Sequence, residues 1–134
     1  MRRRRRVSGQ ARRDSGSAVV EFVLVAPLLL AVALAVIQVL LTFHVRATLT
    51  SAAAEGARAA SLAGADPAAG IARTRSLLDG TLSGSVVTEV TARRRTVNGL
   101  RVMVVCVTAR LPLNALLGSP MLSVEGRALE EGWT

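Results

Sequence analysis

The longest hydrophobic stretch of the chain lies near its start. Residues 22–41 are all apolar except Pro27 and Gln38, and the apolar character begins at Val19. A helix rises about 1.5 Å per residue, so twenty helical residues span roughly 30 Å, which is the hydrocarbon thickness of a bilayer. The pattern therefore predicts a transmembrane helix over residues 19–41.

Small residues dominate the stretch that follows. Residues 42–63 contain no helix breaker, so we expect the same helix to continue to Ala63. Its small and apolar residues recur at steps of three and four and would share one face of the helix, where another element could approach closely. These residues are Leu49, Ala52, Gly56, Ala59 and Ala63.

A second, shorter helix is predicted between two glycines. Gly64 suits the C-cap of the first helix, and Asp66 and Pro67 suit the N-cap and first position of the next, which Gly80 would end. The spacing of the apolar residues predicts which side chains face the core and which face solvent. Ile71, Thr74, Leu77 and Leu78 are expected inward, and Arg73 and Arg75 outward.

The C-terminal part changes to the period of a β-strand. Residues 86–97 and 100–111 are rich in Val and Thr, and Asn98-Gly99 between them is a strong signal for a type I′ hairpin. In that register the numbers of opposed residues sum to 197, which determines which side chains share a face of the hairpin. One of the two faces is apolar and should pack on the helix. That face holds Val86, Val90, Ala92, Met103, Val105, Val107, Ala109 and Leu111. The opposite face holds Glu89, Thr91, Arg93, Arg95, Val102, Val104, Cys106, Thr108 and Arg110.

Residues 121–129 alternate in the same way and predict a third strand. Leu122, Val124 and Ala128 should point inward, and Ser123, Glu125 and Arg127 outward. The predicted fold class is therefore α+β, with a long N-terminal helix, a short second helix and a three-stranded antiparallel sheet. Residues 1–16 form a basic leader expected to be flexible, 17–63 the long helix, and 64–134 a small extracytoplasmic domain.

Positive charge is concentrated before the apolar run. Residues 1–16 contain seven of the 17 arginines and a single acid, Asp14, and only Arg46 follows the run closely. By the positive-inside rule the N-terminus is cytoplasmic, which makes the chain a single-pass protein of the cytoplasmic membrane. Residues 2–6 could bind nucleic acid. We favour a topology signal that touches anionic lipid.

The inventory of reactive side chains argues against an enzyme. The chain of 134 residues has one Cys, Cys106, one His, His44, and three aromatic residues. This excludes an intramolecular disulfide, a zinc cluster and an activated nucleophile with a His base, and it leaves no stacking platform for nucleic acid. We expect no cofactor, no metal and no small-molecule substrate.

One charged residue lies where a plain membrane anchor gains nothing from it. Glu21 sits in the apolar segment, where an ionised carboxylate costs at least about 2.5 kcal/mol on insertion scales. Gly16 precedes it at the boundary, so a cut after Gly16 would make Ser17 the first residue and Glu21 the fifth.

This spacing resembles the processing site of type IV pilin-like proteins. Residues 13–22 and 26–30, together with the small-residue stretch at 53–60, are similar to the TadE-like family of minor pseudopilins of the tight-adherence (Flp) pilus machinery. The resemblance implies cleavage by a prepilin peptidase after Gly16, at a processing site formed by Gly16, Ser17, Glu21 and Phe22. It also implies a pilin-like fold, pairing of Glu21 with a neighbour's N-terminal amine, and contacts to other pseudopilins or pilins and the assembly platform.

Several alternatives remain open. Ala33-Leu34-Ala35 satisfies the rule for a signal peptidase, and a secreted or membrane-anchored extracytoplasmic binding module is the competing function. Glu55, Gly56 and Arg58 could dock another assembly protein or serve only packing. Cys106 is expected to be inert, with an intermolecular disulfide as the alternative. Pro27 is either a functional kink or a tolerated residue.

Overall fold

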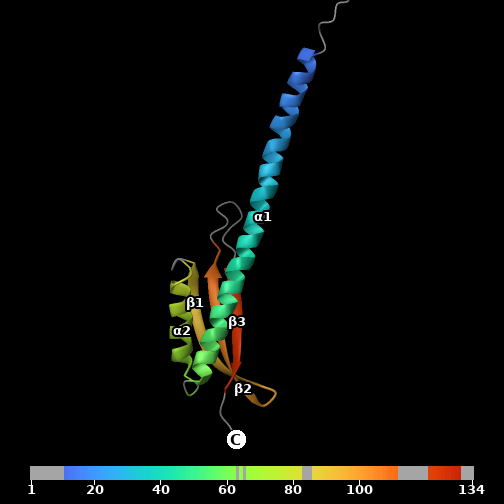
Figure 1. The fold of residues 1–134 in the computed structure, drawn as a ribbon. Helices are drawn as coiled ribbons and strands as arrows, with labels where there is room; N and C mark the ends of the chain where they lie inside the picture. The colour runs from blue at the N-terminus through green and yellow to red at the C-terminus, as the bar shows by residue number, and fades with distance from the viewer. Residues whose placement is uncertain (1–10, 63, 65, 83–85, 112–120, 131–134) are drawn as a thin grey trace, which may run out of the picture. The chain divides into compact units, whose positions relative to one another are not determined.

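The computed structural model describes residues 11–62, 64, 66–82, 86–111 and 121–130, and its elements follow the predicted order. The chain divides into two compact units, Met1–Val39 and Leu40–Thr134. The α+β class with two helices and a three-stranded antiparallel sheet is confirmed. The elements are α1 (Ala11–Leu62), α2 (Pro67–Asp79), β1 (Val87–Val97), β2 (Leu100–Arg110) and β3 (Met121–Leu129) (Figure 1).

The first helix is longer than its apolar content predicts. It has 52 residues and continues through Pro27. It begins at Ala11, so the expectation of a flexible leader is wrong for residues 11–16, while the rest of the leader lies outside the described residues. Ala11, Arg12 and Arg13 are favourable helix formers, whereas residues 14–16 (Asp-Ser-Gly) are not, so helix propensity favours only the first turn of this segment.

The second helix begins and ends where its capping residues predict. The Asp66 carboxylate accepts a hydrogen bond from the Ala68 N–H at 3.0 Å, Pro67 opens the helix, and Gly80 is its C-cap. Gly64 has a φ of 73°, the left-handed conformation that ends many helices. The inward side chains are also as predicted: Thr74 and Leu78 are buried, Ile71 and Leu77 are half-buried, and Arg73 and Arg75 are exposed.

The hairpin register is confirmed over most of its length. Asn98 and Gly99 have φ angles of 52° and 79°, the two positive values that a type I′ turn needs. Val97 lies opposite Leu100 and Val90 opposite Val107, so opposed numbers sum to 197.

The register fails at the start of β1. An irregularity between Val87 and Glu89 places Val87, instead of Thr88, opposite Ala109. The Arg110 N–H donates to the Val86 carbonyl at 2.7 Å, so the predicted pairing of Val86 with Leu111 is wrong. The extra residue is a β-bulge, which the turn cannot predict. Val86 and Val87 both pack, half-buried, against the core.

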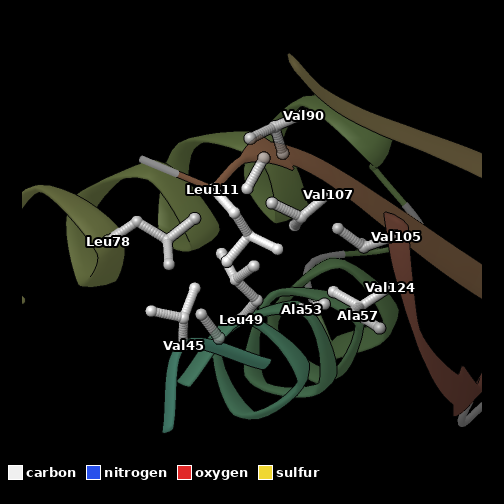
Figure 2. Close-up of a cluster of buried hydrophobic side chains, with 12 residues drawn as sticks. Val45, Leu49, Ala53, Ala57, Leu78, Val90, Val105, Val107, Leu111 and Val124 are labelled. Carbon is white, nitrogen blue, oxygen red and sulfur yellow. The ribbon is translucent and has the colours of Figure 1, made fainter. Parts of the chain in front are cut away.

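The core lies between one face of the sheet and the second half of α1. Val105 and Val107 are fully buried, and Val90 and Val124 nearly so, against Leu49, Ala53 and Ala57 of α1 and Leu78 of α2 (Figure 2). The prediction that Val90, Val105 and Val107 face the helix is confirmed. The strand and the helix lie in direct contact at Gly126, where a Cβ would overlap the backbone of Ala53 and Ala54.

Glycines also allow α2 to lie close to α1. A Cβ on Gly56 would overlap the Thr74 hydroxyl and would lie 2.8 Å from the Gly70 carbonyl oxygen. Thr74 is buried, and its hydroxyl donates to the Gly70 carbonyl at 2.8 Å. The small-residue stretch of α1 therefore serves packing within the chain: the sheet packs on one side of it and α2 on the other.

Candidate processing site and contact surfaces

The predicted processing residues lie together on exposed turns of α1. Gly16, Ser17, Glu21 and Phe22 are all exposed, and Phe22 retains 71 % of its surface. Their helix has a segment of 18 residues with a mean hydropathy of 2.8, none of which is buried. By length and composition it is the one helix of the described residues that could cross a membrane.

The surroundings of Glu21 are apolar along the whole segment. Between Asp14 and Arg46, Glu21 is the only Asp, Glu, Lys or Arg residue. Residues four apart share one face of a helix about 6 Å apart along its axis, so Ser17 and Glu21 lie on the same side. An amine created at Ser17 and the Glu21 carboxylate would therefore face the same neighbouring helix.

The second candidate contact lies on α1 in the unit that begins at Leu40. Gly56 is buried beneath α2, whereas Glu55 and Arg58 are exposed. The structure therefore separates the three predicted contact residues. Gly56 packs within the chain, and only Glu55 and Arg58 present their side chains outward, where another protein could reach them.

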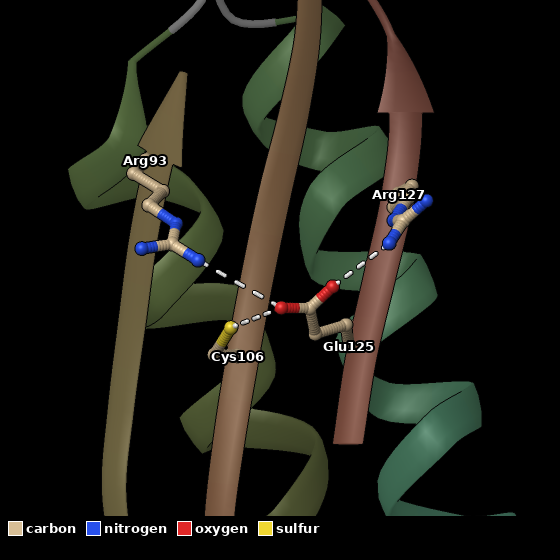
Figure 3. A network of polar contacts seen from close by, with 4 residues as sticks. All are labelled: Arg93, Cys106, Glu125 and Arg127. Atoms are coloured by element: carbon tan, nitrogen blue, oxygen red, sulfur yellow. Dashed lines mark hydrogen bonds and ion pairs between the residues drawn. The ribbon is translucent and has the colours of Figure 1, made fainter. Parts of the chain in front are cut away.

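A polar cluster that sequence analysis did not predict lies on the sheet face turned away from the helices. The Glu125 carboxylate accepts a hydrogen bond from Arg127 at 3.1 Å and one from the Cys106 thiol at 3.4 Å, and it lies 3.8 Å from the Arg93 guanidinium (Figure 3). Cys106 lies opposite both Thr91 and Glu125 in the sheet. The β1–β2 hairpin alone predicts that Thr91 lies beside Cys106, whereas the position of Glu125 beside Cys106 depends on the register between β2 and β3.

These contacts shift two pKa values in opposite directions. Desolvation and the neighbouring Glu125 carboxylate raise the pKa of the Cys106 thiol. Hydrogen bonds from Arg127 and Cys106 lower the pKa of Glu125. The thiol is therefore kept in its neutral, less nucleophilic form, as expected of a structural cysteine.

Arginine side chains also cover apolar surface on this face. Val104 is only 1 % exposed, although neither α1 nor α2 covers its side of the sheet. It lies between Arg93 and Arg127 in the register, and their aliphatic stems shield it while the guanidinium groups remain in water. Within the described residues, no group of three or more His, Cys, Asp or Glu side chains could hold a metal ion.

The match to a protein family begins at the predicted cleavage position. Residues 16–58 match the family model described as TadE-like protein. The TadE-like segment starts at Gly16 and ends at Arg58, so it contains every predicted processing and contact residue, and the resemblance is confirmed over this part of the chain. The second helix and the sheet lie outside it. Neither the curated proteins nor the solved structures contain a match to the chain.

Proposed function

We propose that the chain is a membrane-anchored minor pseudopilin that takes part in assembling a tight-adherence (Flp-type) pilus or a related secretion filament. The observation that carries this proposal is the TadE-like segment. It begins at Gly16, includes Glu21, and continues along α1 into the folded unit. The N-terminus lies in the cytoplasm, α1 crosses the cytoplasmic membrane once, and the sheet lies outside the cell or in the periplasm.

The energetics of Glu21 favour assembly over simple anchoring. Its carboxylate has no cationic neighbour in the apolar segment, so it disfavours the inserted monomer. Cleavage after Gly16 by a prepilin peptidase frees an amine at Ser17, whose ordinary pKa of about 8 makes it mostly cationic at neutral pH. On an adjacent subunit this amine pairs with Glu21, and the low dielectric of the hydrocarbon strengthens the attraction.

Partners in assembly also contact the outer part of α1. Glu55 and Arg58 carry opposite charges on an exposed surface of the TadE-like segment, and they offer a contact for another pseudopilin, a pilin or the assembly platform. Gly56 supports that surface indirectly, because it holds α2 against α1. The proposal involves no catalysis, no cofactor and no nucleic acid.

The cleavage step is tested by sequencing the mature N-terminus of the chain recovered from membranes. We expect Ser17 as the first residue. Gly16→Val should leave the arginine leader attached, because it adds bulk at the cut site. Gly9→Val, within the leader, is the matched control and should be processed normally. A mature N-terminus at Val36 would instead support signal peptidase and would contradict the proposal.

The assembly step is tested with Glu21→Ala. Membrane level and processing should equal those of the parent chain, whereas co-purification with filament and platform proteins should be lost, since the neighbour's amine has no partner. Gln38→Ala removes another polar side chain from the same apolar segment and should leave co-purification unchanged. Normal co-purification and filament output for Glu21→Ala would exclude Glu21 as an assembly contact.

A further inference from the structure

Among the residues that the structure describes, one edge of the sheet has backbone groups that face outward and pair with no other strand. β3 is an edge strand, because the sheet order is β1-β2-β3. The Glu130 N–H donates to the Arg101 carbonyl at 3.1 Å. This bond shows that the even-numbered residues direct their N–H and C=O groups toward β2. Because backbone groups alternate in direction along a strand, the odd-numbered residues of β3 direct theirs away from β2. These residues are Met121, Ser123, Glu125, Arg127 and Leu129.

The outer edge of β3 also borders a groove. Its lining consists of Arg58, Ser61 and Leu62 of α1 and residues 127–129 of β3, and it encloses about 490 Å³. Ala128 points to the inner face of the sheet, and Arg127 and Leu129 point to the outer face. A groove that touches both faces of β3, and no residue of β2, lies beside the edge of the strand and is flanked by the last turns of α1.

The chemistry of the groove is basic and aliphatic. Leu62 and Leu129 are 66 % and 60 % exposed. In the described part of the chain no carboxylate lies within ion-pair distance of Arg58, and Arg127 shares Glu125 with Arg93. An occupant that supplies a carboxylate beside apolar side chains would complement both arginines and both leucines.

We propose that this groove receives an extended segment of a partner protein, which pairs with β3 as a fourth strand and presents a carboxylate side chain to Arg58 and Arg127. Strand addition uses the outward backbone groups of β3 for affinity and the groove for specificity. A polyanion without a peptide backbone would use the arginines alone and would leave the edge of β3 unpaired.

The other edge of the sheet is less suited to this role. β1 carries three consecutive arginines, Arg93, Arg94 and Arg95. Charged side chains of this kind protect an edge strand from pairing with another chain. On β3, the Arg127 guanidinium and the Glu125 carboxylate form an ion pair at 3.1 Å. The edge of β3 also lies beside a groove. The difference between the two edges favours β3 as the docking edge.

The test uses the full chain in detergent micelles and a fluorescein-labelled peptide of alternating Val and Glu residues. Fluorescence anisotropy should show binding, and replacing every Glu of the peptide with Gln should weaken it about tenfold. Methylating every backbone nitrogen of the peptide should abolish binding, because it removes all N–H groups that could pair with β3. Hydrogen exchange should show new protection at the amides of Arg127 and Leu129, which face the peptide.

Variants of the chain separate the backbone contribution from the charge contribution. Leu129→Pro removes an outward N–H, and Leu129→Ala is its matched control, since both lose the leucine side chain. The proline variant should bind the peptide about tenfold more weakly than the alanine variant. Arg58→Gln should also weaken binding, whereas Arg75→Gln, an exposed arginine on α2, should not.

Three outcomes would overturn the proposal. The first is an absence of binding by the Val-Glu peptide. The second is equal binding of the N-methylated peptide, which would indicate attraction to a polyanion only. The third is concentration-dependent self-association that Leu129→Pro blocks, which would make a second copy of the chain the occupant. None of these measurements depends on cleavage after Gly16, so they can fail or succeed independently of the proposed function.

Discussion

The part of α1 up to Val39 and the part from Leu40 to Leu62 differ in what their side chains contact. In the first part all large apolar side chains are exposed, from Val19 at 63 % to Val39 at 54 %. In the second part Leu49, Ala53 and Ala57 are completely buried by the sheet and α2. The same helix is therefore apolar for two different reasons.

This difference indicates where each part finds its stability. The buried side of the second part consists mainly of small residues because a strand and a helix lie directly on its backbone. A change of volume at these buried positions therefore alters the fold of the unit. The first part has bulky side chains that are exposed among the residues that the structure describes. By its length and composition this part fits the apolar interior of a membrane.

The largest disruption of the packed part is expected from Val107→Asp. Val107 is fully buried between β2 and α1, so the substitution buries an unpaired carboxylate. Urea unfolding of the full chain in micelles, followed by hydrogen exchange of β2, should show a loss of roughly 3 kcal/mol or more, and the unit should unfold. Thr91→Asp, on the exposed outer face, is the control. Similar stability of both variants would contradict the assigned core face.

A smaller loss is expected from Gly126→Ala. The added Cβ would overlap the backbone of Ala53 and Ala54, so β3 or α1 must move. Such overpacking typically lowers the free energy of unfolding by about 1–3 kcal/mol. Ser123→Ala adds no atom near the helix and should leave stability within about 0.5 kcal/mol of the parent. An unchanged unfolding midpoint for Gly126→Ala would mean that the strand and the helix are farther apart than described.

Features with a local cause could be predicted from the sequence. Asn98-Gly99 determines a turn whose two residues need positive φ, and the turn then sets which side chains of β1 and β2 face the helix. Asp66, Pro67 and Gly80 mark the ends of α2 through capping. The processing residues rest on the same kind of local signal, their spacing relative to a strong apolar run, and they stay a prediction.

Features that depend on contacts between distant segments could not be predicted in this way. The small-residue stretch around Gly56 indicates close approach, but it does not say that α2 would occupy that side. Nothing near Gly126 indicates that it lies on Ala53, and the cluster around Glu125 appears only when β3 is aligned with β2. The bulge at the start of β1 arises because both Val86 and Val87 pack against the core, which outweighs a regular ladder.

Glu125→Gln should have a small effect that depends on pH. Arg127 and Cys106 lower the pKa of Glu125 in the folded unit, so its carboxylate stabilises the fold above its ordinary pKa of about 4.3. That contribution disappears as the pH falls through the lowered pKa. Replacing the carboxylate should therefore flatten the decline of stability below about pH 4.3.

The measurement for this variant is the urea midpoint from pH 7 down to pH 3, compared with the parent chain. Glu89→Gln, an exposed glutamate on the same face of the sheet, is the control and should keep the decline of the parent. The effect should be small because the cluster is close to solvent, where ion pairs contribute little. A decline of equal steepness in Glu125→Gln and the parent would show that the cluster does not affect stability.

Leu34→Asp should have no effect on the folded unit, and it tests the comparison most directly. Leu34 is 50 % exposed and belongs to the unit that ends at Val39, whereas the sheet and α2 belong to the unit that begins at Leu40. The free energy of unfolding of β2, measured in micelles, should equal that of the parent. Membrane insertion should suffer instead, because a carboxylate near the middle of the span costs about 2.5–3.5 kcal/mol. A loss of β2 stability with normal insertion would mean that the two parts of α1 depend on each other and would contradict their separation.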